Sequence, residues 1–246
     1  MRGDRRAVLG LIMACGLALG CDSPPPAGQP ADASASAPAA ASVTAAPAAS
    51  SSAPVVEGPP LLTPKAATGT APDSYDVVLD TTKGKATIRV TRAWAPRAAD
   101  RFHHLVKIGY YDDVPFYRVT LEVAQFGIHG DPKVNEAWRE AYFMDEMVKH
   151  PNEARTVSFA RRGSDTRTTQ IFINLKDNSA DFDDQGFAPF GEVVEGFDEV
   201  IAKLSHEHGE RPQQGDAPKR MMAEGAPFIK KEFPKLDWIK SAKLKE

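Results

Sequence analysis

The run Gln170-Ile171-Phe172-Ile173-Asn174-Leu175 alternates strictly between two kinds of side chain. Successive side chains of a β-strand point to opposite faces, so the three aliphatic residues share one face. The other face presents Gln170, Phe172 and Asn174, which are an aromatic ring between two amides. The run therefore predicts a strand that has a core on one side and a groove on the other.

Other short strand-like runs lie on both sides of this one, and loops rich in Gly, Asp and Asn separate them. Upstream, alternating apolar residues flank Thr81-Thr82-Lys83-Gly84, which indicates a β-hairpin that begins at Tyr75. Residues 236–244 supply a candidate closing strand. The remaining candidate strands are 115–119, 121–126, 156–160, 170–175 and 190–194. Many short strands with few helices are typical of a barrel or a sandwich.

Two segments have helical spacing instead. In residues 96–109, Pro96 suits a first helical turn, apolar residues recur at helical intervals, and Gly109 is a stop signal. The second segment, 197–204, places four apolar side chains on one helical face, namely Phe197, Val200, Ile201 and Leu204. The expected architecture is a β-barrel flanked by two helices.

The N-terminus has the pattern of an export signal. Three arginines within residues 2–6 precede an apolar stretch, 7–20, that is too short to span a bilayer comfortably. The overlapping run Leu17-Ala18-Leu19-Gly20-Cys21 resembles the lipobox of bacterial lipoproteins. This predicts a signal peptide, 1–20, and acylation of Cys21, which would hold the protein at a membrane. The alternative is an ordinary secretory signal with an incidental cysteine.

Residues 21–74 are dominated by Ala, Pro, Ser, Gly and Thr and carry few charges. Such a segment cannot bury a core, so we expect a disordered tether with an r.m.s. reach of roughly 40 Å. Residues 75–246 would form the folded domain with a C-terminal extension. A lipid anchor at Cys21 would place this domain in the periplasm of a bacterial cell envelope, at the inner or the outer membrane.

Several functional classes are excluded by composition. Both cysteines lie within the first 21 residues, which removes disulfides, zinc thiolates and thiol nucleophiles from the rest of the chain. The formal net charge is −3 and the Lys and Arg residues are dispersed, so no nucleic-acid partner is expected. His206-Glu207-His208 lacks zinc-site spacing, and no G-x-S-x-G or H-E-x-x-H motif is present. We expect neither a metal nor a cofactor.

Three blocks of sequence, in their order and spacing, resemble the cyclophilins. They are Phe116-Tyr117-Arg118-Val119 with Gln125-Phe126-Gly127, Val157-Ser158-Phe159-Ala160 with the run 168–173, and Phe187-Ala188-Pro189-Phe190-Gly191. The resemblance implies a mainly β fold, a closed eight-stranded antiparallel β-barrel capped by two α-helices. It also implies cis–trans isomerisation of X-Pro bonds, here in exported or envelope proteins whose folding it would assist. Unfolded or Pro-containing polypeptides would be the partners, and we expect a monomer.

The resemblance assigns roles to individual residues. Arg118 would be the catalytic group, because a guanidinium that donates to a twisted prolyl nitrogen favours the transition state. Gln125 and Gln170 would contact the substrate backbone, and Phe172 would form the floor of the proline pocket. The rest of the expected pocket is Ala160 at its edge, Phe182 and Phe187 on its wall, and Val123 in place of the family's methionine.

The chain departs from the family pattern at two places. The segment 118–125 is one residue shorter than usual and lacks a Phe-Met pair, and its Glu122 is a candidate to pair with Arg118 and compete with substrate. Arg161-Arg162 replaces a small or apolar pair, so these arginines either determine a preference for acidic substrates or point into solvent. The shortened segment keeps a second function open, a catalytically weak chaperone or scaffold that binds Pro-containing segments.

Overall fold

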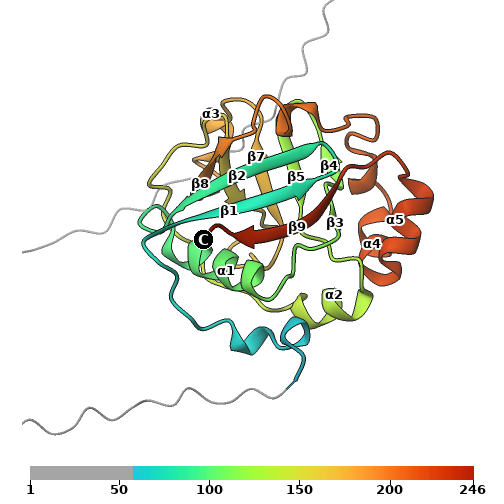
Figure 1. The fold of residues 1–246 in the computed structure, drawn as a ribbon, viewed down its shortest axis with the longest axis horizontal. Coiled ribbons are helices and arrows are strands. Elements are labelled where there is room, and N and C mark those ends of the chain that lie inside the picture. The colour runs from blue at the N-terminus through green and yellow to red at the C-terminus, as the bar shows by residue number, and fades with distance from the viewer. Residues whose placement is uncertain (1–57) are drawn as a thin grey trace, which may run out of the picture. The chain divides into compact units, whose positions relative to one another are not determined.

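The computed structural model describes residues 58–246. The predicted signal peptide, Cys21 and the tether up to residue 57 lie outside the described residues. One antiparallel sheet dominates this part of the chain, in the strand order β3-β9-β1-β2-β8-β6-β7-β5-β4 (Figure 1). The strands are β1 Ser74–Thr81, β2 Gly84–Thr91, β3 Val114–Pro115, β4 Arg118–Val119, β5 Val123–Phe126, β6 Thr156–Phe159, β7 Ile171–Asn174, β8 Pro189–Glu195 and β9 Trp238–Leu244.

The two ends of this sheet are neighbours in the chain. Strand β3 pairs with β9 and strand β4 pairs with β5, and only Phe116 and Tyr117 separate β3 from β4. Counted as one interrupted strand, β3 and β4 reduce the nine segments of residues 58–246 to the predicted eight. The mainly β, antiparallel barrel fold is therefore confirmed, and its closure passes through the covalent chain at Phe116 and Tyr117.

One of the two predicted helices is confirmed and one is wrong. Helix α1, Pro96–Lys107, begins at the expected proline and precedes Gly109, whose φ of 72° ends it. Residues 197–204 contain only a 3-10 turn, Ile201–Lys203. Their apolar side chains are buried, but the chain turns back sharply after Gly196, whose carbonyl accepts from two successive amides. A single tight turn is enough to bury this short apolar face.

The structure adds short elements that the sequence did not predict. The helices are α2 Pro132–Trp138, α3 Ser179–Phe182, α4 Ala217–Glu224 and α5 Ala226–Glu232, and the 3-10 turns are η1 Pro60–Leu62, η2 Pro64–Ala66 and η4 Arg211–Gln213. Helices this short are marginal in isolation, so tertiary packing stabilises them rather than local propensity. Within residues 58–246, none of the helices is long and apolar enough to cross a bilayer.

Alternating strand residues fill the barrel, and α1 packs against it. Helix α1 buries five side chains in this core, namely Ala98, Ala99, Phe102, Leu105 and Val106. Ile171 and Ile173 of β7 point inward and are fully buried, as their period-two spacing predicts. The core therefore holds β7 in place while its other face remains available to line a groove.

A second, smaller apolar cluster belongs to residues 205–236, which we call the C-terminal excursion. Its own buried residues are Met221, Phe228, Ile229, Phe233 and Leu236, and they pack against Tyr117 and Ile128 of the barrel. Figure 1 shows α4 and α5 at the side of the barrel, next to β3 and β4. The excursion is therefore attached beside the junction that closes the sheet.

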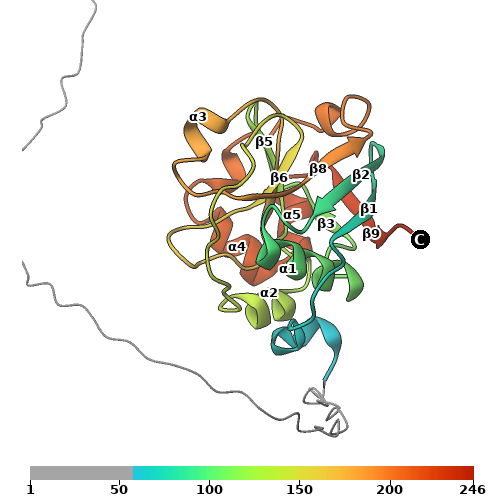
Figure 2. The same cartoon turned by 90° about the vertical axis from the view of Figure 1, so that its left-hand side faces the viewer.

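Folded structure begins before Tyr75, the predicted first residue of the domain. The indole Nε1 of Trp138 donates to the Leu61 carbonyl at 2.9 Å, and the Ala71 amide donates to Asp100 Oδ1 at 2.8 Å. Figure 2 shows residues 58–73 running beneath α1 and α2. Residues 58–73 were predicted as tether, and this part of the prediction is wrong because Leu61 packs against the core and tertiary hydrogen bonds hold the backbone.

Candidate active site

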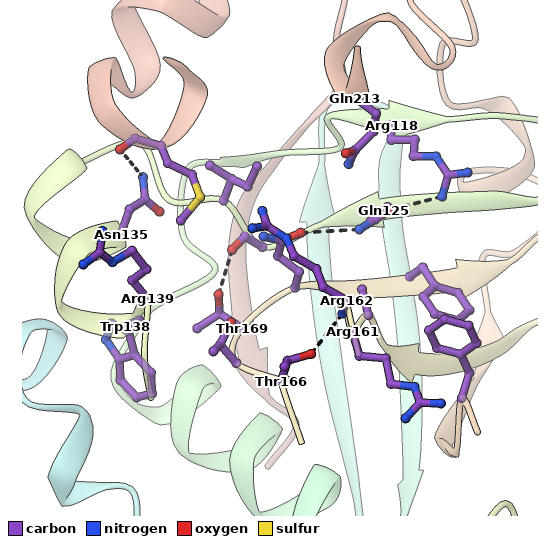
Figure 3. A pocket seen from close by; sticks show the side chains of 18 of the residues that line it. Arg118, Gln125, Asn135, Trp138, Arg139, Arg161, Arg162, Thr166, Thr169 and Gln213 are labelled. Atoms are coloured by element: carbon purple, nitrogen blue, oxygen red, sulfur yellow. Dashed lines mark hydrogen bonds between the residues drawn. The ribbon is translucent and has the colours of Figure 1, made fainter. Parts of the chain in front are cut away.

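All eight pocket residues predicted from the resemblance line one cavity of about 730 Å³ (Figure 3). These residues are Arg118, Val123, Gln125, Ala160, Gln170, Phe172, Phe182 and Phe187. They come from β4, β5, β7 and α3 and from the loops that follow β6 and α3. Three blocks that are far apart in the sequence therefore meet on one face of the sheet.

Strand register places the central residues in a row. Arg118 of β4 is paired with Gln125 of β5, and Gln125 is paired with Phe172 of β7. Side chains of directly paired residues lie on the same face, about 4.5–5.5 Å apart at Cβ. The guanidinium, the amide and the aromatic ring are therefore neighbours because of the backbone pairing.

Gly127 brings the next polar residue close to this row. Its φ is 110°, and a Cβ on it would lie 2.3 Å from the Thr169 carbonyl oxygen. Only glycine permits so close an approach of the two backbones. The chain that carries Gln170 is consequently held against the end of β5.

A buried phenol orients the amide of Gln170, and Arg118 contacts the amide of Gln125. Tyr117 donates its hydroxyl to Gln170 Oε1 at 2.7 Å, and Arg118 Nη1 donates to Gln125 Oε1 at 3.1 Å. Burial raises the pKa of Tyr117 well above its usual range, so the hydroxyl stays protonated as a donor. No role for Tyr117 was predicted, because nothing in the local sequence distinguishes it from a core aromatic residue.

Three aromatic rings form the apolar part of the cavity. Phe172 is 4% exposed, and its ring stands edge-to-face to Phe182 and Phe187 at centroid distances of 5.5 and 5.4 Å. Val123 is buried beside them and Ala160 is half-buried at the rim. Edge-to-face contacts are the favoured geometry for such pairs. The rings therefore form a rigid apolar recess that suits a pyrrolidine ring.

Comparison with known proteins agrees with this geometry. The sequence model of the family described as "Cyclophilin type peptidyl-prolyl cis-trans isomerase/CLD" matches residues 76–221. The chain belongs to this family. The isomerase cyp18 of Streptomyces antibioticus is 31% identical over 150 residues, covering 58% of this chain and 90% of the relative. Isomerase A of Dickeya dadantii is 31% identical over 174 residues, covering 65% and 88%.

Among solved structures, a cyclophilin-type isomerase of Cryptosporidium parvum aligns with a TM-score of 0.49 and 21% identity, covering 70% of this chain and 98% of that one. The members of the family whose sequence model matches are peptidyl-prolyl cis–trans isomerases, and this chain is one because it belongs to that family.

In this cyclophilin, a carboxylate lies against the predicted catalytic arginine. Arg118 Nε donates to both carboxylate oxygens of Glu210 at 3.0 and 2.9 Å, and Nη2 donates to Oε1 at 2.7 Å. Glu122 was the predicted candidate partner of Arg118. That prediction is wrong, because Glu122 pairs with Lys176 at 3.4 Å. Glu210 lies on the C-terminal excursion, and no local pattern connects it to Arg118.

Arg161 and Arg162 of this cyclophilin have different surroundings. Arg161 pairs with Asp145, donates to the Gln185 carbonyl and lies over the Phe187 ring at 5.7 Å. Its side chain is therefore part of the pocket wall rather than directed into solvent. Arg162 also lines the cavity, and its side chain is exposed.

A fully buried arginine supports that wall. Arg167 is 1% exposed, donates through Nη2 to the Gly186 carbonyl at 2.6 Å and lies 3.1 Å from Asp145. Burial lowers the pKa of Arg167, and the Asp145 charge opposes that effect. Asp145 thus neutralises two guanidinium groups. These two arginines in turn connect the loop that carries Ala160 to the carbonyls of Gln185 and Gly186, next to Phe187.

Proposed function

We propose that this isomerase acts on X-Pro bonds of exported or envelope polypeptides and assists their folding, with Arg118 as the catalytic group. The observation that carries the assignment of Arg118 is its place in one row with Gln125 and Phe172, beside the aromatic recess. The recess suits the proline ring, and the neighbouring guanidinium would donate to the prolyl nitrogen of a bound substrate.

The reaction requires no covalent step. Rotation about the peptide bond has a barrier of about 18–20 kcal/mol, because the planar amide loses its resonance as it twists. The twisted nitrogen regains a lone pair, so a donor aimed at it binds the transition state more tightly than the planar ground state. Arg118 is suited to this part, since a guanidinium carries five N–H groups and remains charged.

The contacts of Arg118 leave donors for a substrate. Its hydrogen bonds to Glu210 and Gln125 occupy one N–H on each of its three nitrogens. The other two of its five N–H groups have no partner among residues 58–246. A charge-assisted hydrogen bond contributes about 1.5–3 kcal/mol, which corresponds to roughly ten- to a hundredfold in rate.

The rest of the acceleration comes from how the substrate is held. Gln125 and Gln170 present amide groups that suit a peptide backbone, and Tyr117 holds Gln170 in one orientation. Fixing one side of the X-Pro bond while the other turns lowers the entropic cost of reaching the transition state. The three phenylalanines remove water from the rotating bond.

The cellular setting of the proposal is supported by sequence alone. A signal peptide at 1–20 and acylation of Cys21 would anchor the protein to a membrane of the bacterial envelope. The domain would then meet unfolded, Pro-containing polypeptides in the periplasm as a monomer. When the protein is expressed in the presence of a labelled fatty acid, we expect it to take up the label. The substitution Cys21→Ala should abolish this labelling.

Exchange spectroscopy by NMR on X-Pro peptides tests the activity. The full chain should accelerate cis–trans exchange, and Arg118→Ala should lower kcat/KM by roughly ten- to a hundredfold. Arg89→Ala is the matched control, because Arg89 also pairs with a carboxylate, Asp76 at 2.9 Å, but lies on β2 outside the cavity. Peptide binding without acceleration would replace the isomerase by a chaperone or scaffold of the same fold.

A further inference from the structure

The charged side chains of the cavity are not balanced. Its lining contains four arginines and two glutamates, and no lysine, aspartate or histidine among residues 58–246. Arg118 is paired with Glu210, and Arg161 is paired with Asp145 from outside the lining. Arg139 lies 3.4 Å from both Glu136 and Glu140. Three of the four guanidinium groups therefore have a carboxylate partner.

Arg162 is the fourth. No ion pair joins its side chain to any carboxylate of residues 58–246, and the side chain is exposed. Figure 3 shows the Arg162 side chain extending toward the middle of the pocket, whereas the side chain of Arg161 points away from it. The surplus positive charge of the cavity is therefore carried by Arg162.

The backbone at Arg162 is held in place. The amides of Arg162 and Gly163 both donate to Thr166 Oγ1, at 3.0 and 3.1 Å, and Thr166 donates back to the Gly163 carbonyl. This closed turn limits where the guanidinium can move. A group fixed at its base binds a partner at a lower cost in conformational entropy than one on a freely moving loop.

The positive charge of Arg162 also acts on a buried group beside the pocket. Burial raises the pKa of Tyr117, and the positive charges of Arg118 and Arg162 oppose that rise. Tyr117 is the residue that orients Gln170, so Arg162 acts electrostatically on the same part of the cavity that would hold the peptide backbone.

We infer that Arg162 is a specificity-determining residue that selects polypeptide segments with an aspartate or glutamate immediately before the proline. The inference rests on the proposed isomerase function, because it concerns the substrates of the same site. A carboxylate flanking the proline would neutralise the one lining guanidinium that has no partner. Lysine or arginine at the same place would be repelled. The three paired arginines contribute little to this choice, because their charges are already compensated.

The test uses the full chain and three peptides that differ only in the residue before proline, which is Glu, Gln or Lys. The wild-type protein should isomerise the Glu peptide with a kcat/KM about three- to fivefold above that of the Gln peptide, with the Lys peptide lowest. Arg162→Gln should bring the three values together. Arg139→Gln, which removes an exposed but paired guanidinium, should keep the order.

Two outcomes overturn the inference. One is equal kcat/KM values for the three peptides with the wild-type protein, and the other is an order that survives Arg162→Gln. Dissociation constants from NMR titration of the same peptides separate this inference from the proposed function. If no peptide is isomerised but the Glu peptide binds most tightly and only through Arg162, the isomerase proposal fails and the acidic preference stands.

Discussion

Glu210 holds Arg118 in a bidentate ion pair, although 92 positions separate them in the chain. The pair is partly exposed, with Arg118 at 29% and Glu210 at 47% of side-chain accessibility. The C-terminal excursion therefore reaches the predicted catalytic group through the Glu210 side chain. A substrate that uses the charge of Arg118 has to compete with this carboxylate.

Removing the charge of Glu210 is expected to raise activity. Glu210→Gln keeps an acceptor for Arg118 but no longer neutralises it, and an exposed pair is worth up to about 1 kcal/mol. The value of kcat/KM should therefore rise by up to about fivefold. Glu122→Gln is the control, since Glu122 pairs with Lys176 instead. An unchanged or lower kcat/KM in the Glu210 variant would show that the carboxylate positions Arg118 without restraining it.

The hydroxyl of Tyr117 is expected to affect activity through Gln170. Tyr117→Phe removes the 2.7 Å hydrogen bond that orients this amide, so kcat/KM should fall by roughly fivefold, corresponding to about 1 kcal/mol. Tyr111→Phe is a matched control, because that buried hydroxyl donates to the Thr169 carbonyl at 3.0 Å and Tyr111 does not line the cavity. Equal losses of activity in both variants would assign the effect of Tyr117 to stability.

The excursion is expected to lose stability in acid through His208. Burial lowers the pKa of His208, and Arg211 and Lys235 lower it further. As the pH falls below about 6.5, His208 binds a proton in the unfolded chain but resists it in the folded chain. The free energy of unfolding therefore decreases as the pH falls from about 6.5 toward the lowered pKa of the folded state.

The substitution His208→Gln isolates this effect. Glutamine retains an acceptor for the Lys235 amide, which donates to His208 Nε2 at 3.3 Å, but it does not titrate. Urea unfolding at pH 7.5 and pH 5 should therefore show a smaller loss of stability in the variant than in the wild-type protein. Parallel curves would assign the pH dependence to other histidines whose pKa is lowered by partial burial, such as His104 and His129.

The segment before Tyr75 is expected to stabilise the barrel. A chain that begins at residue 75 lacks the Leu61 carbonyl that accepts from Trp138 and the Ala71 amide that donates to Asp100. At about 1 kcal/mol for each hydrogen bond, it should unfold about 2 kcal/mol more easily than a chain that begins at residue 58. The midpoints of urea unfolding measure this difference, and identical midpoints would show that residues 58–73 do not stabilise the barrel.

Local spacing was sufficient to predict much of the barrel. The alternation in residues 170–175 correctly separated the buried Ile171 and Ile173 from the cavity-lining Phe172. The hairpin, the helix that begins at Pro96 and the closing strand are also as expected. These features succeed because a strand repeats every two residues and a helix every 3.6, so the periodicity alone identifies the buried face.

Helix-like spacing was not sufficient in residues 197–204. The same four apolar positions are buried by one 3-10 turn after Gly196, because the direction of the chain after β8 decides how far a helix can continue. Helices α4 and α5 were not predicted for the converse reason. Each is short, and the apolar cluster that stabilises them is completed by Tyr117 and Ile128 of the barrel.

The sequence by itself determined the strands, the three blocks that meet in the cavity and the family to which the chain belongs. Only the tertiary structure decided which charges meet there. Glu210 rather than Glu122 pairs with Arg118, and Arg161 rather than Arg162 is neutralised by Asp145. The physical reason is that the two features depend on residues at different separations along the chain. Strand periodicity is a property of adjacent residues, whereas an ion pair depends on a few ångströms between groups that the fold alone brings together.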